Sequence, residues 1–137
     1  MALSNNEIQV EWSSSTSVAV TAGGNQTSDA INFSAGCLAA GITIKADSAG
    51  PAAGDTVDFW LLLTAGDPDT DPTVTAEYPA GDDHGMYLGQ IDTNAQDADK
   101  LSVEIPACFP YAKLYAKSNA SSNSITVSAC INEKVVS

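Results

Sequence analysis

The sequence contains no arginine, and its five lysines oppose 17 acidic residues, so the 137-residue chain has a formal net charge of −12. Proteins that bind nucleic acids normally present a basic face to the phosphates. Strong negative charge also opposes binding to an anionic membrane surface. The composition therefore predicts a protein with neither nucleic acid nor membrane among its partners.

Long apolar runs and paired cysteines are also missing. No stretch approaches the roughly 20 apolar residues that a membrane-spanning helix needs, and the opening MALSNNEIQVEW has no basic or apolar region typical of a signal peptide. The cysteines Cys37, Cys108 and Cys130 are odd in number and far apart, which favours neither a disulfide framework nor a zinc site. We therefore expect buried, free thiols in a chain folded in a reducing cytoplasm.

The usual signatures of catalysis are absent as well. His84 is the only histidine, and although it follows Asp82 and Asp83, no nucleophile motif accompanies it. Asp55 with Asp58 or Glu104 could be invoked as a carboxylate pair for glycoside hydrolysis, but any acidic chain offers such pairs. The sequence also places no carbohydrate-stacking row among its scattered tyrosines, Tyr78, Tyr87, Tyr111 and Tyr115. We therefore predict that the protein is not an enzyme.

What the sequence does contain is alternation of apolar and polar residues between clusters of turn-forming residues. This pattern is typical of antiparallel strands, and helical periodicity is weak, with the best place for one helical turn at 92–101. The expected strands are 7–12, 15–22, 41–46, 55–65, 86–92, 100–106, 111–118 and 124–136, and 30–36 is either a short strand or a connection. The pattern predicts an all-β, single-domain antiparallel β-sandwich, with a jelly roll as one arrangement.

The N-terminal segment is predicted to differ from the rest. We assign residues 1–14 to a flexible arm and the first strand, and residues 15–137 to the sandwich. Ile8, Val10 and Trp12 alternate with polar residues, and Trp12 is either a core residue or an anchor against a partner. These three residues form the candidate partner interface. The long strand at 55–65 is apolar on both faces in its second half, so we expect it to be central and buried, with Trp60 in the core.

An acidic loop follows that long strand. Asp67, Asp69 and Asp71 alternate with other residues, and such spacing can wrap a calcium ion. An EF-hand would need glycine and glutamate at its sixth and twelfth positions, where this chain has Pro72 and Tyr78. We therefore expect a solvated loop and no cofactor, and we keep a calcium-dependent binding module as an alternative.

Three stretches carry a resemblance. GDTVDFWLLLTAGDPD, HGMYLGQIDTN and YAKLYAKSNASSNSITVSACI, which together span residues 54–131, resemble parts of small all-β virion structural proteins of tailed bacteriophages. Among these, the chain is most similar to capsid decoration, or cement, proteins. The shared motifs are strand and loop patterns with no chemistry attached.

The resemblance implies a function in assembly. Decoration proteins of this type are made in the host bacterial cytoplasm and bind the exterior of the icosahedral head of the virion. There they stabilise the coat lattice by non-covalent contacts. The implied partners are the major capsid protein and further copies of the chain itself, as a homotrimer. A head–tail connector, tail or fibre protein is the alternative within the virion, and a secreted carbohydrate-binding or hydrolytic domain is one outside it.

Overall fold

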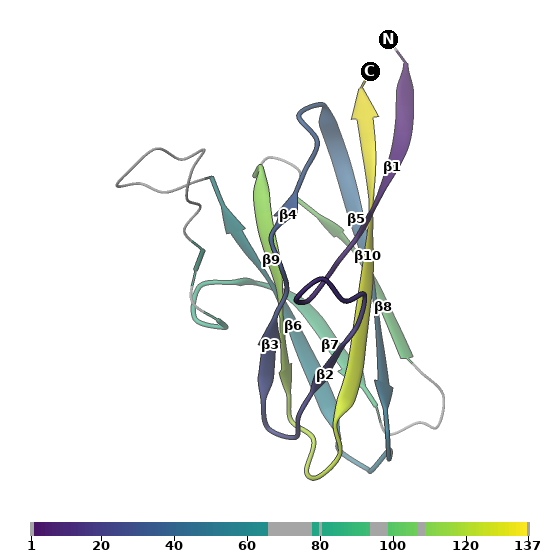
Figure 1. Cartoon of the computed structure of the whole chain (residues 1–137), viewed down its shortest axis with the longest axis vertical. Helices are drawn as coiled ribbons and strands as arrows, with labels where there is room; N and C mark the ends of the chain where they lie inside the picture. The colour runs from purple at the N-terminus through teal and green to yellow at the C-terminus, as the bar shows by residue number, and fades with distance from the viewer. Residues whose placement is uncertain (1, 66–77, 80, 94–98, 107–108, 137) are drawn as a thin grey trace.

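The computed structural model describes residues 2–65, 78–79, 81–93, 99–106 and 109–136, and these form an all-β fold without a helix (Figure 1). The strands are β1 (Leu3–Gln9), β2 (Val18–Val20), β3 (Asn25–Thr27), β4 (Ile31–Asn32), β5 (Cys37–Ser48), β6 (Thr56–Thr64), β7 (Met86–Asp92), β8 (Asp99–Ile105), β9 (Tyr111–Ser118) and β10 (Ile125–Val136). The predicted fold class is confirmed.

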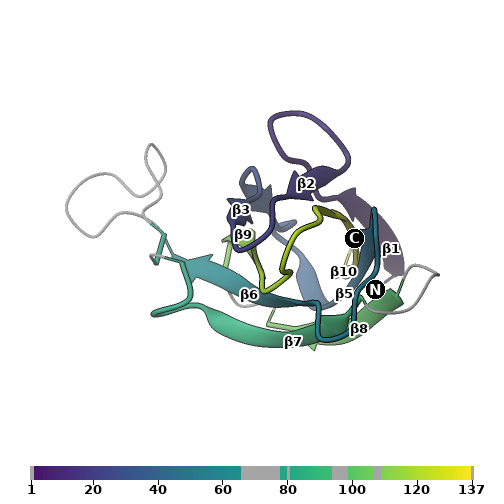
Figure 2. The same ribbon diagram turned by 90° about the horizontal axis from the view of Figure 1, so that it is seen from below.

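The strands form two antiparallel sheets that face each other (Figure 2). Sheet one has the order β1-β10-β5-β8, with the short β2 also paired to β10. Sheet two has the order β3-β9-β6-β7, with β4 also paired to β9. The chain crosses between the sheets repeatedly, so that most neighbours within a sheet, apart from β6 and β7, are not consecutive strands of the chain. This interleaving is that of a jelly roll built from two Greek keys.

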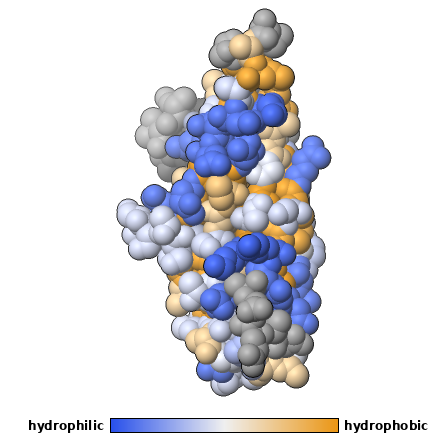
Figure 3. Space-filling model, turned by 90° about the vertical axis from the view of Figure 1, so that its right-hand side faces the viewer, coloured by the Kyte–Doolittle hydropathy of each residue, from blue (hydrophilic) through white to orange (hydrophobic). Residues whose placement is uncertain are grey.

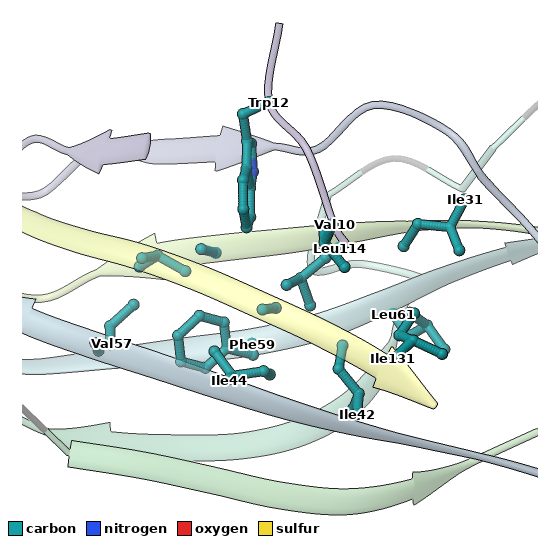
Figure 4. Close-up of a cluster of buried hydrophobic side chains, with 14 of the residues drawn as sticks. Val10, Trp12, Ile31, Ile42, Ile44, Val57, Phe59, Leu61, Leu114 and Ile131 are labelled. Atoms are coloured by element: carbon teal, nitrogen blue, oxygen red, sulfur yellow. The ribbon is translucent and has the colours of Figure 1, made fainter. Parts of the chain in front are cut away.

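The core lies between the two sheets. Successive side chains of a strand point to opposite faces, so each strand contributes one row to the interior. Ile42 and Ile44 from sheet one meet Phe59 and Leu61 from sheet two, and all four side chains are at most 1% exposed (Figure 4). The alternation that predicted the strands is thus the alternation that fills the core.

The first strand begins earlier than predicted. The segment expected to be a flexible arm is β1, which pairs with β10 in a register running from Leu3 opposite Val136 to Gln9 opposite Cys130. The long β10 offers a free row of backbone groups, and β1 supplies the missing hydrogen bonds. Residues 2–7 are exposed, so no apolar alternation marked them as a strand.

Two further local predictions differ from the structure. The Gly23-Gly24 turn forms, with the N–H of Gly24 donating to the carbonyl of Thr21 at 2.8 Å, but the chain then enters β3 at Asn25, which the sequence did not indicate. The helical turn expected within 92–101 is wrong at both ends, because these belong to β7 and β8. Residues 94–98 lie outside the described residues.

The strand β6 is central and buried on both faces at Leu61 and Leu62, as predicted. Leu62 points away from the main core and is covered by the segment at Gly85, where a Cβ atom would lie only 2.9 Å from the Leu62 Cδ2. The prediction that Trp60 belongs to the core is wrong. Phe59 occupies the inward position, so alternation places Trp60 half-buried on the outer face of sheet two.

The core predicts the cost of truncating Phe59, its largest fully buried side chain. Replacing Phe59, which is fully buried, by alanine should lower the free energy of unfolding by about 3–5 kcal/mol because it removes apolar burial and leaves a cavity. Urea unfolding followed by tryptophan fluorescence measures this. Leu38→Ala, at a side chain that is 61% exposed, is the control and should change stability by less than about 0.5 kcal/mol. Equal losses in the two variants would contradict the assignment of the core.

Candidate binding surfaces

The outer face of sheet one carries a shallow groove with a volume of about 530 Å³. Strand pairing aligns Glu7, Asn132, Gly41 and Glu104 in one row across β1, β10, β5 and β8. Gly41 leaves a gap in this row, and a Cβ atom there would meet nothing closer than the Val103 carbonyl oxygen at 3.6 Å. The backbone therefore tolerates a side chain at this position, and its absence deepens the groove.

The chemistry of this groove suits binding more than acid–base catalysis. The next row contains Cys130, Thr43 and Ser102, with the two hydroxyl groups 2.8 Å apart. Glu7 and Glu104 lie three strands apart, or about 14 Å at the usual strand spacing. Paired glycosidase carboxylates lie within about 10 Å of each other, so these two do not form such a pair.

The outer face of sheet two carries a row of aromatic side chains. Register places Trp60 between Tyr115 on β9 and Tyr87 on β7. The Trp60 ring lies 5.3 Å from the Tyr87 ring in an edge-on arrangement and 5.7 Å from the Tyr115 ring, centroid to centroid. The sequence did not reveal this row, because its members come from three strands and only the register aligns them.

Beside the aromatic row, Asp58 is the centre of a hydrogen-bond network. Its carboxylate accepts hydrogen bonds from the Tyr87 hydroxyl at 2.7 Å and from the side-chain amides of Gln90 and Asn119, the shortest of these at 3.1 and 2.9 Å. The hydrogen bond to Asp58 stabilises the protonated hydroxyl and, with burial, raises the pKa of Tyr87 to about 12. The phenol therefore stays protonated near neutral pH.

A loop segment is fastened to the same face at its edge. Lys117 and Asp82 form an ion pair of 2.8 Å, and both side chains are more than a third exposed. The hydrogen bond with Lys117 lowers the pKa of Asp82, and the same bond raises the pKa of Lys117. Exposed pairs of this kind contribute little stability, so the pair mainly positions the segment around Gly81 over Tyr115.

An apolar area lies at the end of sheet one that carries both termini (Figure 3). Leu3 is 58% exposed and lies opposite Val136 in the β1–β10 register. Leu38 is 61% exposed and lies where the register between β5 and β10 shifts, between Lys134 and Val135. Such a bulge re-aims a side chain, here toward solvent. We call Leu3, Leu38 and Val136 the apolar end.

A buried acid supports this end from inside. Glu133 is fully buried, and its carboxylate accepts hydrogen bonds from the Asn6 amide at 2.8 Å and from both the N–H and the hydroxyl of Ser34, at 2.7 and 2.8 Å. Burial raises its pKa, but the hydrogen bonds outweigh burial, so the net pKa is lowered. Glu133 thus links β1 and the segment before β5 to β10, and no sequence pattern indicates that it is buried.

The predicted partner-interface residues lie mostly inside the protein. Val10 is fully buried and Trp12 is 4% exposed, and both point into the core (Figure 4), while Ile8 is half-buried against it. A tight turn directly after Trp12 helps to hold it there. In this turn the N–H groups of Ser13 and Ser14 both donate to the Asp29 carboxylate at 3.0 Å. Packing therefore assigns Val10 and Trp12 to the chain's own core, and a partner contact at these residues stays a prediction.

The remaining predicted sites have mixed outcomes. Asp67, Asp69 and Asp71 lie outside the described residues, so the calcium loop stays a prediction, and the described part of the chain holds no cluster of potential metal ligands. His84 is exposed. Cys37 and Cys130 are free and half-buried rather than fully buried, and burial raises the pKa of both thiols. Cys108 lies outside the described residues.

Comparison with known proteins finds neither a matching family model nor a matching curated protein. Solved structures do match. The chain is similar to the infectious bursal disease virus Gx strain structure, with 11% identity, a TM-score of 0.62, 97% of this chain and 32% of that one covered. The C-terminal CBM6 of the laminarinase LamC from Zobellia galactanivorans matches with 13% identity and a TM-score of 0.52, over 94% of this chain and all of that one.

A further match covers 98% of this chain and 26% of a Clostridium thermocellum xylanase 10B structure with its CBM22-1 and GH10 modules, at 12% identity and a TM-score of 0.56. The chain thus spans about a third of the viral chain that it resembles. At these identities the likeness shows the fold alone. That shared fold is a β-sandwich. Within the described residues, no helix is long and apolar enough to span a membrane.

The network around Glu133 predicts a pH-dependent stability. A carboxyl group whose folded-state pKa is below its ordinary value of 4.5 contributes stability above that value and loses it as pH falls. Glu133→Gln should therefore lower the free energy of unfolding by about 1–3 kcal/mol at neutral pH, and the difference from the wild type should shrink toward about pH 3. Urea unfolding at both pH values measures this.

The control for this prediction is Glu7→Gln, at an exposed glutamate on the same edge of sheet one. It removes the same charge without removing a buried hydrogen-bond acceptor, so the stability should stay close to that of the wild type. A destabilisation by Glu133→Gln that is equal at both pH values would contradict the role given to the charged carboxylate.

Proposed function

We propose that the chain is a bacteriophage capsid decoration protein, which binds the outer surface of the icosahedral head as a homotrimer and stabilises the coat lattice. The similarity of residues 54–131 to tailed-phage virion proteins supports this, and so does a fold that capsid proteins also use. The observation that carries the proposal is the apolar end, where two exposed leucines lie at the same end of sheet one on a chain of net charge −12. The partner is the major capsid protein.

The apolar end can bind a coat protein through non-covalent contacts alone. Burying a leucine side chain contributes about 1.5–3 kcal/mol, and the free edge of β1 can add backbone hydrogen bonds to an extended segment of the partner. A trimer that meets a symmetric site multiplies such modest contacts through avidity. A ligand that binds the assembled shell then stabilises it by mass action. The acidic remainder of the surface keeps the free protein soluble and separates neighbouring copies.

The position of β1 decides how this proposal can be tested. Removing residues 2–12 would delete β1 together with the core side chains of Val10 and Trp12, so folding and binding would be lost together. Substitutions at Leu3 and Leu38 change only exposed side chains. Such substitutions therefore separate loss of shell binding from loss of folding.

The first expected result is loss of shell binding in the double variant Leu3→Glu/Leu38→Glu. Two buried charges would replace apolar contacts, so affinity should fall by at least about tenfold. Co-sedimentation with heads of the same virus that lack this protein measures it. The matched control is Ala53→Glu/Thr126→Glu, which adds the same charge at exposed positions toward the other end of the strands and should bind normally. Equal binding by both variants would contradict docking through the apolar end.

Counting the chain in purified particles separates the virion alternatives. A copy number close to that of the coat protein is expected for a decoration protein. A few copies per particle would instead favour the head–tail connector, tail or fibre. Absence from particles would contradict a virion function altogether.

A further inference from the structure

The outer face of sheet two has features that docking through the apolar end does not use. Its row of Tyr115, Trp60 and Tyr87 lies next to the polar group of Asp58, Gln90 and Asn119. We propose that this face binds a neutral saccharide, with the Tyr87 ring as its stacking platform. The proposal is independent of the capsid function, because it rests on other residues on the other sheet.

The Tyr87 ring is exposed yet held in place. The side chain is 54% exposed, while its hydroxyl group donates to Asp58 and its ring packs against the Trp60 ring in a T-shaped arrangement. Trp60 is in turn fixed by Tyr115, which is only 7% exposed. A ring held at its tip and along one side loses little conformational freedom when a ligand stacks on it. Such preorganisation favours binding.

The Asp58 carboxylate holds its neighbouring side chains in place and is not available to bind a charged ligand. Its Oδ1 accepts from Tyr87 and Gln90, and its Oδ2 accepts from Gln90 and Asn119. A carboxylate has about four lone-pair positions, so these four contacts occupy them. A cation would have to displace these donors, and an anion would be repelled by the chain's net charge of −12. The face therefore favours an uncharged ligand.

The hydrogen bonds to Asp58 leave the carbonyl oxygens of two side-chain amides available to a ligand. Gln90 and Asn119 use their NH₂ groups on Asp58, and among the described residues their carbonyl oxygens accept no hydrogen bond. These oxygens can accept hydrogen bonds from hydroxyl groups beside the ring. A sugar in its pyranose form has both parts that this array requires, a face of C–H groups for the aromatic ring and hydroxyl groups at its rim.

Titration calorimetry of the whole chain with neutral oligosaccharides of glucose, xylose, mannose and galactose tests the proposal. We expect the wild type to bind at least one of them. Tyr87→Ala should weaken that binding by about tenfold or more, because the stacking surface is removed. Tyr87→Phe keeps the ring and removes only the hydrogen bond to Asp58, so it should weaken saccharide binding less than Tyr87→Ala does. The Tyr87 side chain is exposed, and thermal melting verifies that both variants remain folded.

Leu38→Ala, at a side chain of similar exposure on sheet one, is the matched control and should bind the saccharide like the wild type. No binding of any of the four saccharides by the folded wild type would overturn the proposal, as would unchanged binding by Tyr87→Ala. The leucine variants of the apolar end should retain saccharide binding while losing shell binding. Failure of one proposal is therefore distinguishable from failure of the other.

Discussion

Burial of one face of each sheet against the other is the constraint on which the rest of this structure depends. Every long strand alternates, so the residues between Ile42, Ile44, Phe59 and Leu61 must point outward once these four point inward. A slip of one residue in any register would turn an apolar row toward water. The core thus fixes the composition of both outer faces, and whatever the protein binds has to be bound there or at the ends.

The two outer faces and the apolar end are chemically different surfaces on one rigid support. Sheet one presents a groove floored by small residues around Gly41, and sheet two presents aromatic rings beside amides. The exposed leucines lie at the end of sheet one that also carries the chain termini (Figure 1). Because these surfaces consist of different residues, a ligand bound at the apolar end would leave both sheet faces open.

Much of the fold could be predicted from the alternation alone. The bounds expected for β7 and β9, Met86–Asp92 and Tyr111–Ser118, agree with the structure, because turn residues flank clear alternation there. The strands β1 and β3 were misplaced or missed, since their side chains are mostly exposed and carry no apolar rhythm. They form only because β10 and β9 offer unpaired backbone groups, which the sequence does not display.

The sequence by itself determined the fold class, the excess of negative charge and the lack of recognisable catalytic motifs, since composition and periodicity are local properties. Only the tertiary structure decided which outward residues are neighbours. The strand register places Trp60 beside Tyr87 in one row. The segment that contains Ser34 covers Glu133 and makes it a buried acid. A turn after Trp12 allows its side chain to lie in the core. Each of these depends on contacts between strands far apart in the chain, and no local pattern encodes them.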